Sequence, residues 1–196
     1  MNKRLFDLIF SGLGLFFLSP FFIFIALWIK WDSPGPIFFR QERVGQFGKI
    51  FYIHKFRTMI VDAEKYGAQI TIGKDSRITK TGFILRQYKL DELPQLIDVF
   101  LGKMSLVGPR PEVPKYVNYY PEDVRDIILS VKPGITDQAS IEFRNENALL
   151  SQALDPEKTY KENILPIKLE YYKNYALKNN IYDDYLIIIK TLKALF

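Results

Sequence analysis

The feature that most constrains this chain is an uninterrupted apolar run close to its N-terminus. Residues 8–29 read LIFSGLGLFFLSPFFIFIALWI and include no charged side chain. A helix of this length can span the hydrocarbon core of a bilayer. The run is too long for a cleaved signal peptide, and no small-residue cleavage site follows it. The sequence therefore predicts a membrane helix, which either spans the bilayer or enters and leaves by the same face.

Two features of this segment favour the re-entrant alternative over a single-pass anchor. Ser19 and Pro20 lie in its middle, where proline removes one backbone hydrogen bond and kinks the helix. The serine hydroxyl can satisfy the carbonyl that proline leaves free, so lipid tolerates the kink. Lys3 and Arg4 precede the run and further basic residues follow it, which places both ends on the cytoplasmic side. Asp7 is expected to cap the helix or to pair with Arg4.

Composition narrows the class of protein and the kind of partner. A chain of 196 residues fits one domain with a sizeable core. It has no cysteine, which excludes disulfides, thiolate metal sites and cysteine nucleophiles. A formal net charge of +5 and an aromatic share of 15% favour anionic partners and contact with membrane lipids. Nucleic acid is not expected, because there is no zinc-finger spacing, RNP motif or long basic run.

The rest of the chain predicts a mixed but mainly helical α+β fold. Residues 37–44 and 50–56 are rich in aromatic and β-branched side chains, and a glycine-containing segment separates them, which predicts a small β-hairpin. Helices are expected over residues 122–131, 164–177 and 182–196. The last of these is amphipathic, so it either packs on the core or lies in the headgroup layer as an interfacial helix.

Residues 89–111, KLDELPQLIDVFLGKMSLVGPRP, carry the pattern that points to chemistry. Proline is best tolerated in the first turn of a helix, so Pro94 places Asp91 and Glu92 at or just before a helix start. Ionised carboxylates and bound phosphate are favoured there. Such a pair suits chemistry on a phosphate with a divalent metal, and an ionised aspartate is a weak nucleophile toward phosphorus. On spacing alone, a simple helix cap is the commoner role of such an aspartate.

Basic residues elsewhere could hold phosphate groups beside this pair. Arginine suits that task because its planar fork can bind two oxygens at once. The alternative for each residue is a surface charge or a contact with a lipid headgroup. The candidates are Lys55 and Arg57 in KFRTM, Arg86 on the segment that leads to Asp91, Arg110 in GPRP, and Arg144 in EFRNE.

The combined pattern DELPQL followed by GxMSxVGPRP resembles the signature of the bacterial sugar transferases, the monotopic phosphoglycosyl transferases. KFRTM and the KPGIT run at residues 132–136 match further motifs of that family. The resemblance extends from the membrane segment to about Asn145, and more loosely beyond. It implies a minimal family member whose N-terminal helix is re-entrant and kinked at its Ser-Pro pair.

The resemblance also implies a two-step reaction at the cytoplasmic face of the bacterial inner (plasma) membrane. Asp91 attacks the β-phosphate of a UDP-sugar, UMP leaves, and a phosphosugar–enzyme intermediate forms. Undecaprenyl phosphate then attacks this intermediate and gives undecaprenyl-diphosphate-sugar. Glu92 matches the second acidic residue of the family and either ligates Mg²⁺ or deprotonates the acceptor. Magnesium usually takes one or two carboxylates plus substrate phosphates, so Asp91 and Glu92 are the expected ligands.

The chain departs from the family pattern after residue 136. The family often continues with a glycine and a glutamine-containing run, whereas residues 137–145 here read DQASIEFRN. The departure leaves recognition of the base and the sugar open. Gln138 is the predicted substrate-binding residue in this run, and Glu142 and Asn145 are further hydrogen-bonding candidates, with a plain loop as the alternative.

Three charged or titratable positions are expected to have structural roles only. His54 is the sole histidine, so it cannot belong to a histidine-based metal cluster and is expected in packing or at the surface. Glu170 and the adjacent Asp183 and Asp184 lie where the family tends to place acidic residues. Charge on a helix surface is the expected role of all three.

These observations predict a monotopic enzyme with a re-entrant helix over residues 1–31 and a cytoplasmic catalytic domain over residues 32–196. As a transferase of a substituted phosphate group, it would begin synthesis of a surface glycan or glycoconjugate, such as lipopolysaccharide, O-antigen, capsule, exopolysaccharide or glycoprotein. Two alternatives stay open. The sugar is a hexose-1-phosphate rather than an amino-sugar-1-phosphate, or the chain is a non-enzymatic, membrane-anchored interaction domain. The oligomeric state is not predicted, and a dimer is compatible with the sequence.

Overall fold

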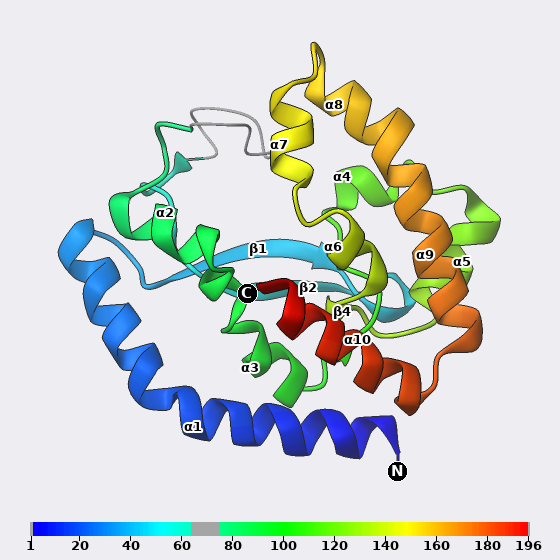
Figure 1. Cartoon of the computed structure of the whole chain (residues 1–196), viewed down its shortest axis with the longest axis horizontal. Helices are drawn as coiled ribbons and strands as arrows, with labels where there is room; N and C mark the ends of the chain where they lie inside the picture. Colours follow the sequence, from blue (N-terminus) through cyan, green and yellow to red (C-terminus); the bar gives the residue numbers. More distant parts are fainter. Residues whose placement is uncertain (1, 64–74, 196) are drawn as a thin grey trace.

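The computed structural model describes residues 2–63 and 75–195, which form a mainly helical molecule with two small sheets (Figure 1). The predicted mainly helical class with a β-hairpin is therefore confirmed. The elements follow in this order: α1 (Lys3–Asp32), β1 (Phe38–Val44), β2 (Ile50–Phe56), α2 (Lys80–Gln87), a 3₁₀ turn (Leu90–Glu92), α3 (Gln95–Phe100), β3 (Ser105–Val107), α4 (Pro114–Val117), α5 (Glu122–Leu129), β4 (Gly134–Thr136), α6 (Gln138–Glu142), α7 (Glu146–Ser151), α8 (Pro156–Thr159), a π-helical stretch (Tyr160–Ile164), α9 (Leu165–Lys178) and α10 (Ile181–Leu195).

Helix α1 contains the apolar run and leaves most of it uncovered along one edge of the molecule (Figure 1). Only 11% of the most apolar 18-residue stretch of this helix is buried, and Trp31 at its end is 93% exposed. Within the described ranges it is the one helix that is long and apolar enough to cross a membrane. So much uncovered apolar surface is what a membrane-associated helix presents.

Pro20 lies inside α1, and the ribbon of this helix changes direction along its length in Figure 1. Proline has no N–H to donate to the carbonyl of Phe16, one turn earlier. The Ser19 hydroxyl donates to that carbonyl oxygen instead, at 2.8 Å. The prediction that this serine satisfies the freed carbonyl is therefore confirmed.

The N-terminal part of α1 is fastened to α3 and β3 by polar contacts. Arg4 donates to the backbone carbonyls of Val99 and Phe100, at 2.6 and 2.8 Å. Asp7 is 2% exposed and accepts from the Ser105 hydroxyl at 3.1 Å and from the next backbone N–H of β3 at 3.0 Å. The predicted cap or Arg4 partner for Asp7 is wrong, because β3 brings two donors to a buried position.

Lys3 connects α1 to α10 at the opposite end of the chain. Its ammonium donates to the carbonyl of Val107 at 3.1 Å and pairs with the Asp184 carboxylate. The Tyr175 hydroxyl donates to the other oxygen of that carboxylate at 2.7 Å. Asp184 is 0% exposed, so the prediction of a surface charge is wrong for this residue. Its burial is possible because a cation and a hydroxyl satisfy it.

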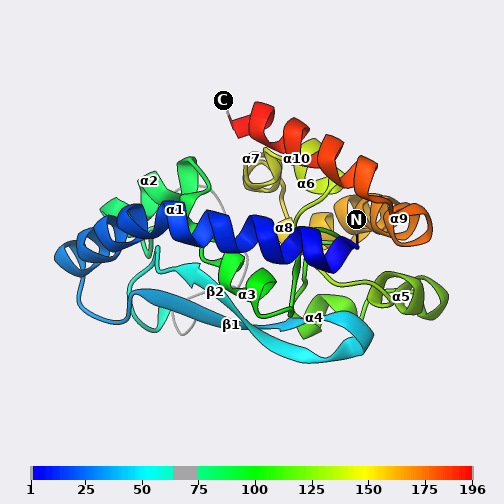
Figure 2. The same cartoon turned by 90° about the horizontal axis from the view of Figure 1, so that it is seen from below.

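The C-terminal part of α1 packs on the same body by apolar contact. Ile25 and Ile29 are buried against Phe56 at the end of β2 and Leu85 on α2. Both ends of α1 therefore pack on the same body (Figure 2). The side chains between them are largely exposed.

The two sheets place the motif residues side by side. β1 and β2 form the predicted antiparallel hairpin, with Val44 opposite Ile50. β3 and β4 pair in parallel, which brings the GPRP turn beside KPGIT. A side-chain carbon on Gly134 would lie 2.1 Å from the backbone nitrogen of Gly108. Glycine is needed at this point because the two backbones approach so closely.

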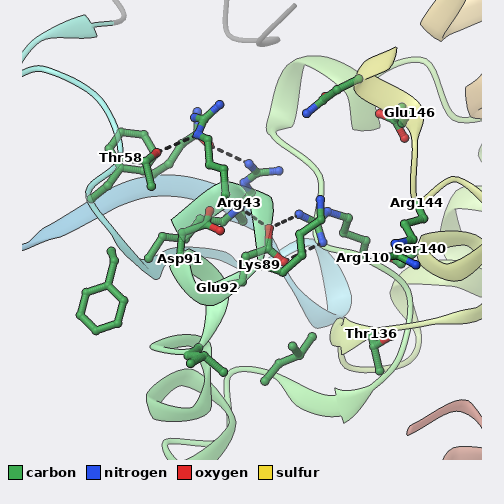
Figure 3. Close-up of a pocket in the computed structure, with 18 of the residues that line it drawn as sticks. Arg43, Thr58, Lys89, Asp91, Glu92, Arg110, Thr136, Ser140, Arg144 and Glu146 are labelled. Carbon is green, nitrogen blue, oxygen red and sulfur yellow. Dashed lines mark hydrogen bonds and ion pairs between the residues drawn. The ribbon is translucent and has the colours of Figure 1, made fainter. Parts of the chain in front are cut away.

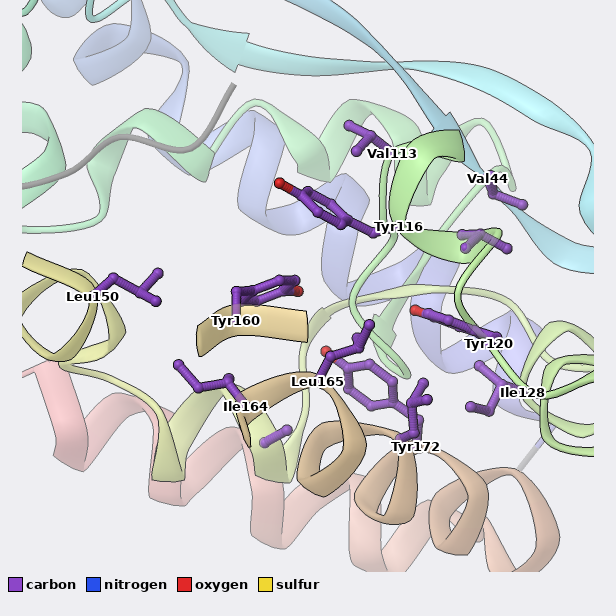
Figure 4. Packing of buried hydrophobic residues seen from close by; sticks show 13 residues of the cluster. Val44, Val113, Tyr116, Tyr120, Ile128, Leu150, Tyr160, Ile164, Leu165 and Tyr172 are labelled. Carbon is purple, nitrogen blue, oxygen red and sulfur yellow. The ribbon is translucent and has the colours of Figure 1, made fainter. Parts of the chain in front are cut away.

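The largest hydrophobic cluster lies among α4, α5, α7 and α9 (Figure 4). Four of its buried members are tyrosines, whose rings fill space while a hydroxyl can reach a polar partner. Tyr160, for example, donates to the Glu112 carboxylate at 2.7 Å. The buried members are Val44, Val113, Tyr116, Val117, Tyr120, Ile128, Ala139, Leu150, Tyr160, Ile164, Leu165, Leu169 and Tyr172.

A buried histidine–aspartate contact fixes β2 on α3. Asp98 is 0% exposed and accepts from the backbone N–H of His54 at 2.8 Å. The His54 Nδ1 atom lies 2.8 Å from the other carboxylate oxygen. Packing, one of the two predicted roles of His54, is confirmed, since 13% of its side chain is exposed. The contact holds the part of β2 from which Lys55 projects.

Replacing Asp98 with alanine is expected to lower the free energy of unfolding by about 2–4 kcal/mol, because it leaves the His54 donors buried without a partner. The measurement is the thermal midpoint of the solubilised protein. Asp126→Ala is the matched control, since 81% of that side chain is exposed on α5. The control should change stability by about 0.5 kcal/mol at most. Equal midpoints for the two variants would contradict the prediction.

Candidate active site

A single large cavity brings the motif residues together. Its volume is ≈ 1360 Å³, and it is lined by the hairpin, the Leu90–Glu92 turn, the GPRP turn, α6, α7 and parts of α9 and α10. Asp91 and Glu92 lie at one end of it, and Arg144 and Glu146 lie across from them (Figure 3). Arg110 lies between the two groups in that view.

Asp91 is delivered to the cavity by a short irregular segment. Lys89 has a φ of 57°, a left-handed conformation that non-glycine residues seldom adopt, and it turns the chain between α2 and the 3₁₀ turn. α3 begins only at Gln95, after Pro94, so the carboxylate pair precedes the helix as the proline predicts. This local strain is consistent with a position selected for function rather than for stability.

The Asp91 carboxylate is buried but carries no hydrogen bond from any donor in the described part of the chain. The residue is 9% exposed and borders the cavity. Burial, and then the negative charge of Glu92, raise the pKa of Asp91 above its ordinary value, while Lys55, Arg86 and Lys89 act in the opposite direction. The lone pairs of this carboxylate are therefore available to a ligand.

The Glu92 carboxylate is satisfied on both oxygens. Lys55 donates to Oε1 at 2.7 Å, and Arg110 grips both oxygens, with Nη1 3.1 Å from Oε2 and Nη2 bound to Oε1. Burial alone would raise the pKa of Glu92, but Arg110 and Lys55 hold it well below its usual range. Glu92 is thus ionised and organises two cations around its neighbour.

Two further arginines complete the cationic end of the cavity. Arg86 donates from Nε to the Thr58 hydroxyl at 2.8 Å and borders the cavity. Arg43 donates to the carbonyl of Pro111 at 2.9 Å, and its Nε is buried without a partner in the described residues. Sequence reasoning missed Arg43 in the cavity. Its position in β1, opposite the second strand of the hairpin, was the available signal.

Two predicted substrate-binding residues are engaged elsewhere. Arg57 borders the cavity, but its guanidinium donates to the carbonyl of Pro36 at 2.6 Å and to Ser33 at 2.7 and 2.8 Å and so holds the turn that follows α1. Gln138 donates to Glu142 at 2.9 Å on α6 and is not among the residues that border the cavity. The structure brings together Asp91, Glu92, Lys55, Arg86 and Arg110, with Arg144 on the opposite wall.

That opposite wall holds polar residues that sequence reasoning did not assign to the site. Ser140 borders the cavity, and Asp137 behind it is 2% exposed and caps α6 by accepting from the backbone N–H and the hydroxyl of Ser140. Lys168 on α9 is 4% exposed and forms an ion pair with Glu146 at the start of α7. The D-x-x-S spacing signals the cap, whereas no sequence pattern links Lys168 to Glu146.

The residues fit a magnesium ion that takes part of its coordination from a substrate. Within the described ranges, no group of three or more His, Cys, Asp or Glu side chains could hold a metal ion. Mg²⁺ commonly uses one or two carboxylates and completes its octahedron with phosphates and water. The unbonded Asp91 carboxylate suits this role. Glu92 has less to offer, because Lys55 and Arg110 both occupy Oε1 and Arg110 also bonds Oε2, which leaves one lone-pair position on Oε2.

Comparison with known proteins agrees with the geometry. A family model described as "Bacterial sugar transferase" matches residues 1–196. The chain is 33% identical over 98% of its length to the UDP-N-acetylgalactosamine-undecaprenyl-phosphate N-acetylgalactosaminephosphotransferase of Aeromonas hydrophila, covering 43% of that protein. It is 38% identical over 96% of its length to the UDP-glucose:undecaprenyl-phosphate glucose-1-phosphate transferase of Escherichia coli (strain K12), covering 39% of it.

A third relative has a length closer to that of this chain. The exopolysaccharide production protein ExoY of Rhizobium meliloti (strain 1021) is 31% identical over 99% of the chain, which covers 85% of that protein. The chain therefore spans most of this relative but only about two fifths of the length of the first two.

Replacing Glu92 with glutamine is expected to lower the free energy of unfolding by about 3–5 kcal/mol at neutral pH, because Arg110 and Lys55 lose their counter-charge. The pKa of Glu92 is lower in the folded protein than its ordinary value of 4.5. Its ionisation therefore stabilises the fold fully above that value, and the effect is lost as pH falls through the lowered pKa. The difference between wild type and variant should shrink on acidification.

Thermal midpoints across a pH series measure this difference. Glu122→Gln is the matched control, since Glu122 is exposed at the start of α5. A Glu92→Gln deficit that stays constant down to strongly acidic pH would contradict the prediction.

Proposed function

The chain belongs to the bacterial sugar transferase family, and from this premise we propose that it is a phosphoglycosyl transferase at the cytoplasmic face of the bacterial inner membrane. It moves a sugar-1-phosphate from a UDP-sugar to undecaprenyl phosphate and releases UMP, in the first membrane step of a surface glycan pathway. The names of two relatives describe transferases of this kind, one for N-acetylgalactosamine and one for glucose. The observation that carries the proposal is the unbonded Asp91 carboxylate inside a frame of cations.

In the first step Asp91 is the nucleophile. One carboxylate oxygen bonds to the β-phosphorus of the UDP-sugar, the bond from that phosphorus to the bridging oxygen breaks, and UMP departs with the electron pair. Two observations support this role: the carboxylate borders the cavity, and no described donor occupies its lone pairs. Lys55 and Arg86 counter the effect of burial and favour the ionised form that attack requires.

The cations act on the phosphoryl oxygens. Lys55, Arg86 and Arg110 border the cavity beside Asp91, where they can pair with the charge that spreads over those oxygens during transfer. Glu92 holds Lys55 and Arg110 in place before the substrate arrives, so little reorganisation is needed. A magnesium ion, when bound by Asp91 and the diphosphate, would neutralise further charge on the same oxygens.

In the second step an oxygen of undecaprenyl phosphate bonds to the phosphorus of the phosphosugar intermediate. The bond between that phosphorus and the Asp91 oxygen breaks, and the carboxylate is regenerated. The acceptor reaches the site from the lipid, which is consistent with a cavity bordered by Phe6 and Phe10 of α1 and by α10.

We further propose that α1 is re-entrant. A helix of 30 residues is about 45 Å long, enough to cross a hydrocarbon core of about 30 Å. A spanning helix would have to place its two ends at opposite membrane faces. Here Arg4 and Asp7 near one end, and Ile25 and Ile29 near the other, contact the same domain. The division into residues 1–31 and 32–196 stays a prediction, and these contacts make the two parts one unit.

The reaction can be tested by UMP release. We expect the purified protein, with undecaprenyl phosphate and Mg²⁺, to release UMP from at least one of UDP-glucose, UDP-galactose, UDP-N-acetylglucosamine and UDP-N-acetylgalactosamine. The accepted donor decides between a hexose and an amino sugar. Asp91→Asn should lower the rate by about a thousandfold or more, because the nucleophile is lost. EDTA should abolish release, whereas Glu122→Gln should leave it intact.

Intact-mass spectrometry without acceptor gives a second readout, since wild type should gain one phosphosugar and Asp91→Asn none. Continued turnover by the Asp91→Asn variant would contradict the covalent mechanism. A folded wild type that forms no UMP with any donor would favour the membrane-anchored interaction domain.

The topology can be tested by labelling, because the chain has no cysteine of its own. Single variants Asn2→Cys and Lys30→Cys place a thiol at each end of α1. A membrane-impermeant maleimide is expected to label both in inverted membrane vesicles and neither in intact spheroplasts. Labelling of the two positions from opposite faces would establish a spanning helix instead.

A further inference from the structure

The two ends of the cavity differ in how their charges are arranged. Around Asp91 the cations outnumber the carboxylates, as a diphosphate requires. On the wall formed by α6 and α7, Glu146 is matched by Lys168, and this pair is close to neutral. Figure 3 shows Glu146 and Arg144 on the side of the cavity away from Asp91. Arg144 adds one positive charge beside this pair, so the second wall is less positive than the end at Asp91 and suits a polar part of a ligand that carries little charge.

Glu146 is held at the cavity by Lys168, a buried lysine that also contacts two aromatic rings. Lys168 is 4% exposed, and its ammonium lies 5.1 Å from the ring centre of Tyr160 and 5.9 Å from that of Phe143. A buried ammonium without a counter-charge is strongly unfavourable, so Glu146 is kept beside it. The side chain of Glu146 is 24% exposed and borders the cavity.

One oxygen of the Glu146 carboxylate can still accept hydrogen bonds from a ligand in the cavity. Lys168 pairs with Oε2, and no described donor bonds Oε1. An ionised carboxylate only accepts hydrogen bonds, at about four lone-pair positions. It can therefore receive two neighbouring hydroxyl groups at once. A carboxylate is a poor partner for phosphate oxygens, which are also negatively charged acceptors. It is a poor partner for the edge of uracil as well, where two carbonyl acceptors flank a single N–H donor.

The in-line geometry of phosphoryl transfer indicates which part of the UDP-sugar reaches this wall. Phosphoryl transfer proceeds with the attacking and leaving oxygens roughly in line. Attack by Asp91 on the β-phosphorus therefore directs the departing UMP away from Asp91 and across the cavity. The ribose of UMP carries two adjacent hydroxyls, which are the donors that a carboxylate can accept together.

We propose that Glu146 accepts hydrogen bonds from the ribose hydroxyls of the nucleotide, and that Lys168 is the residue that positions it. This inference rests on the proposed function for the identity of the nucleotide. It assigns the wall of α6 and α7 to the nucleoside end of the donor. Arg144, which borders the cavity on the same wall, provides a positive charge close to that end.

The test compares UMP with 2′-deoxy-UMP and 3′-deoxy-UMP as ligands of the solubilised full-length protein, by calorimetry. Wild type should bind UMP about 10- to 100-fold more tightly than at least one deoxy analogue, because a carboxylate placed to bond a hydroxyl loses a partner. Glu146→Gln should reduce that preference to about threefold or less and should weaken UMP binding itself. If removing a ribose hydroxyl weakens binding to wild type but not to Glu146→Gln, that hydroxyl is the one that Glu146 contacts.

Glu142→Gln is the matched control, since it makes the same chemical change at an exposed residue of α6 that does not border the cavity. It should keep the full preference for UMP. Lys168→Met should lose part of the preference, with the thermal midpoint reporting any loss of fold. Because Glu146→Gln leaves Lys168 without its counter-charge, the analogue comparison on wild type alone provides a test that does not depend on any variant.

Two results would overturn the inference: a wild type that binds UMP and both deoxy analogues equally, or a Glu146→Gln variant that keeps the preference. Failure of the proposed function is a separate outcome. In that case UDP-sugars would give no UMP, while the preference for ribose hydroxyls could still be measured. Turnover without any preference would refute only the role of Glu146.

Discussion

The arrangement of the site depends on one carboxylate, that of Glu92. It binds Lys55 from β2 and Arg110 from the turn after β3, so a single side chain joins segments that are distant in the sequence. Without it, two half-buried cations would face each other and repel. Because Glu92 takes these contacts, its neighbour Asp91 receives none from the described donors. Two adjacent carboxylates thereby acquire different properties: Glu92 is ionised at neutral pH and holds two cations, and the Asp91 carboxylate accepts no hydrogen bond from a described donor.

The membrane helix and the site are mechanically linked. Arg4 holds the end of α3, the helix that follows Asp91, and Asp7 holds the start of β3, the strand that precedes Arg110. α1 therefore braces both segments that carry the motif. Its exposed apolar side chains are what a membrane-associated helix presents, and its polar contacts support the same segments that the cation frame joins. These contacts hold α3 in place even though it has only 6 residues.

Local patterns predicted local structure, and distant partners escaped prediction. The apolar run, the hairpin and the proline-marked start of α3 follow from residues close together in the chain. Asp7, Asp98 and Asp184 each look like a surface charge on a helix. Their partners lie 98, 44 and 181 positions away, so nothing nearby signals burial. The same holds for Glu146 with Lys168. The motif located Asp91 and Glu92, but only the fold separates their roles.

The electrostatics of Asp91 also indicate why a divalent cation would accompany the substrate. Burial and Glu92 already favour the protonated form of Asp91, against Lys55, Arg86 and Lys89. A diphosphate that binds beside Asp91 would add negative charge and would also favour the protonated form of this carboxyl group. The cations of the protein must then pair with the diphosphate while they also keep Asp91 ionised. A magnesium ion that arrives with the diphosphate would relieve this competition, since its charge acts on both groups.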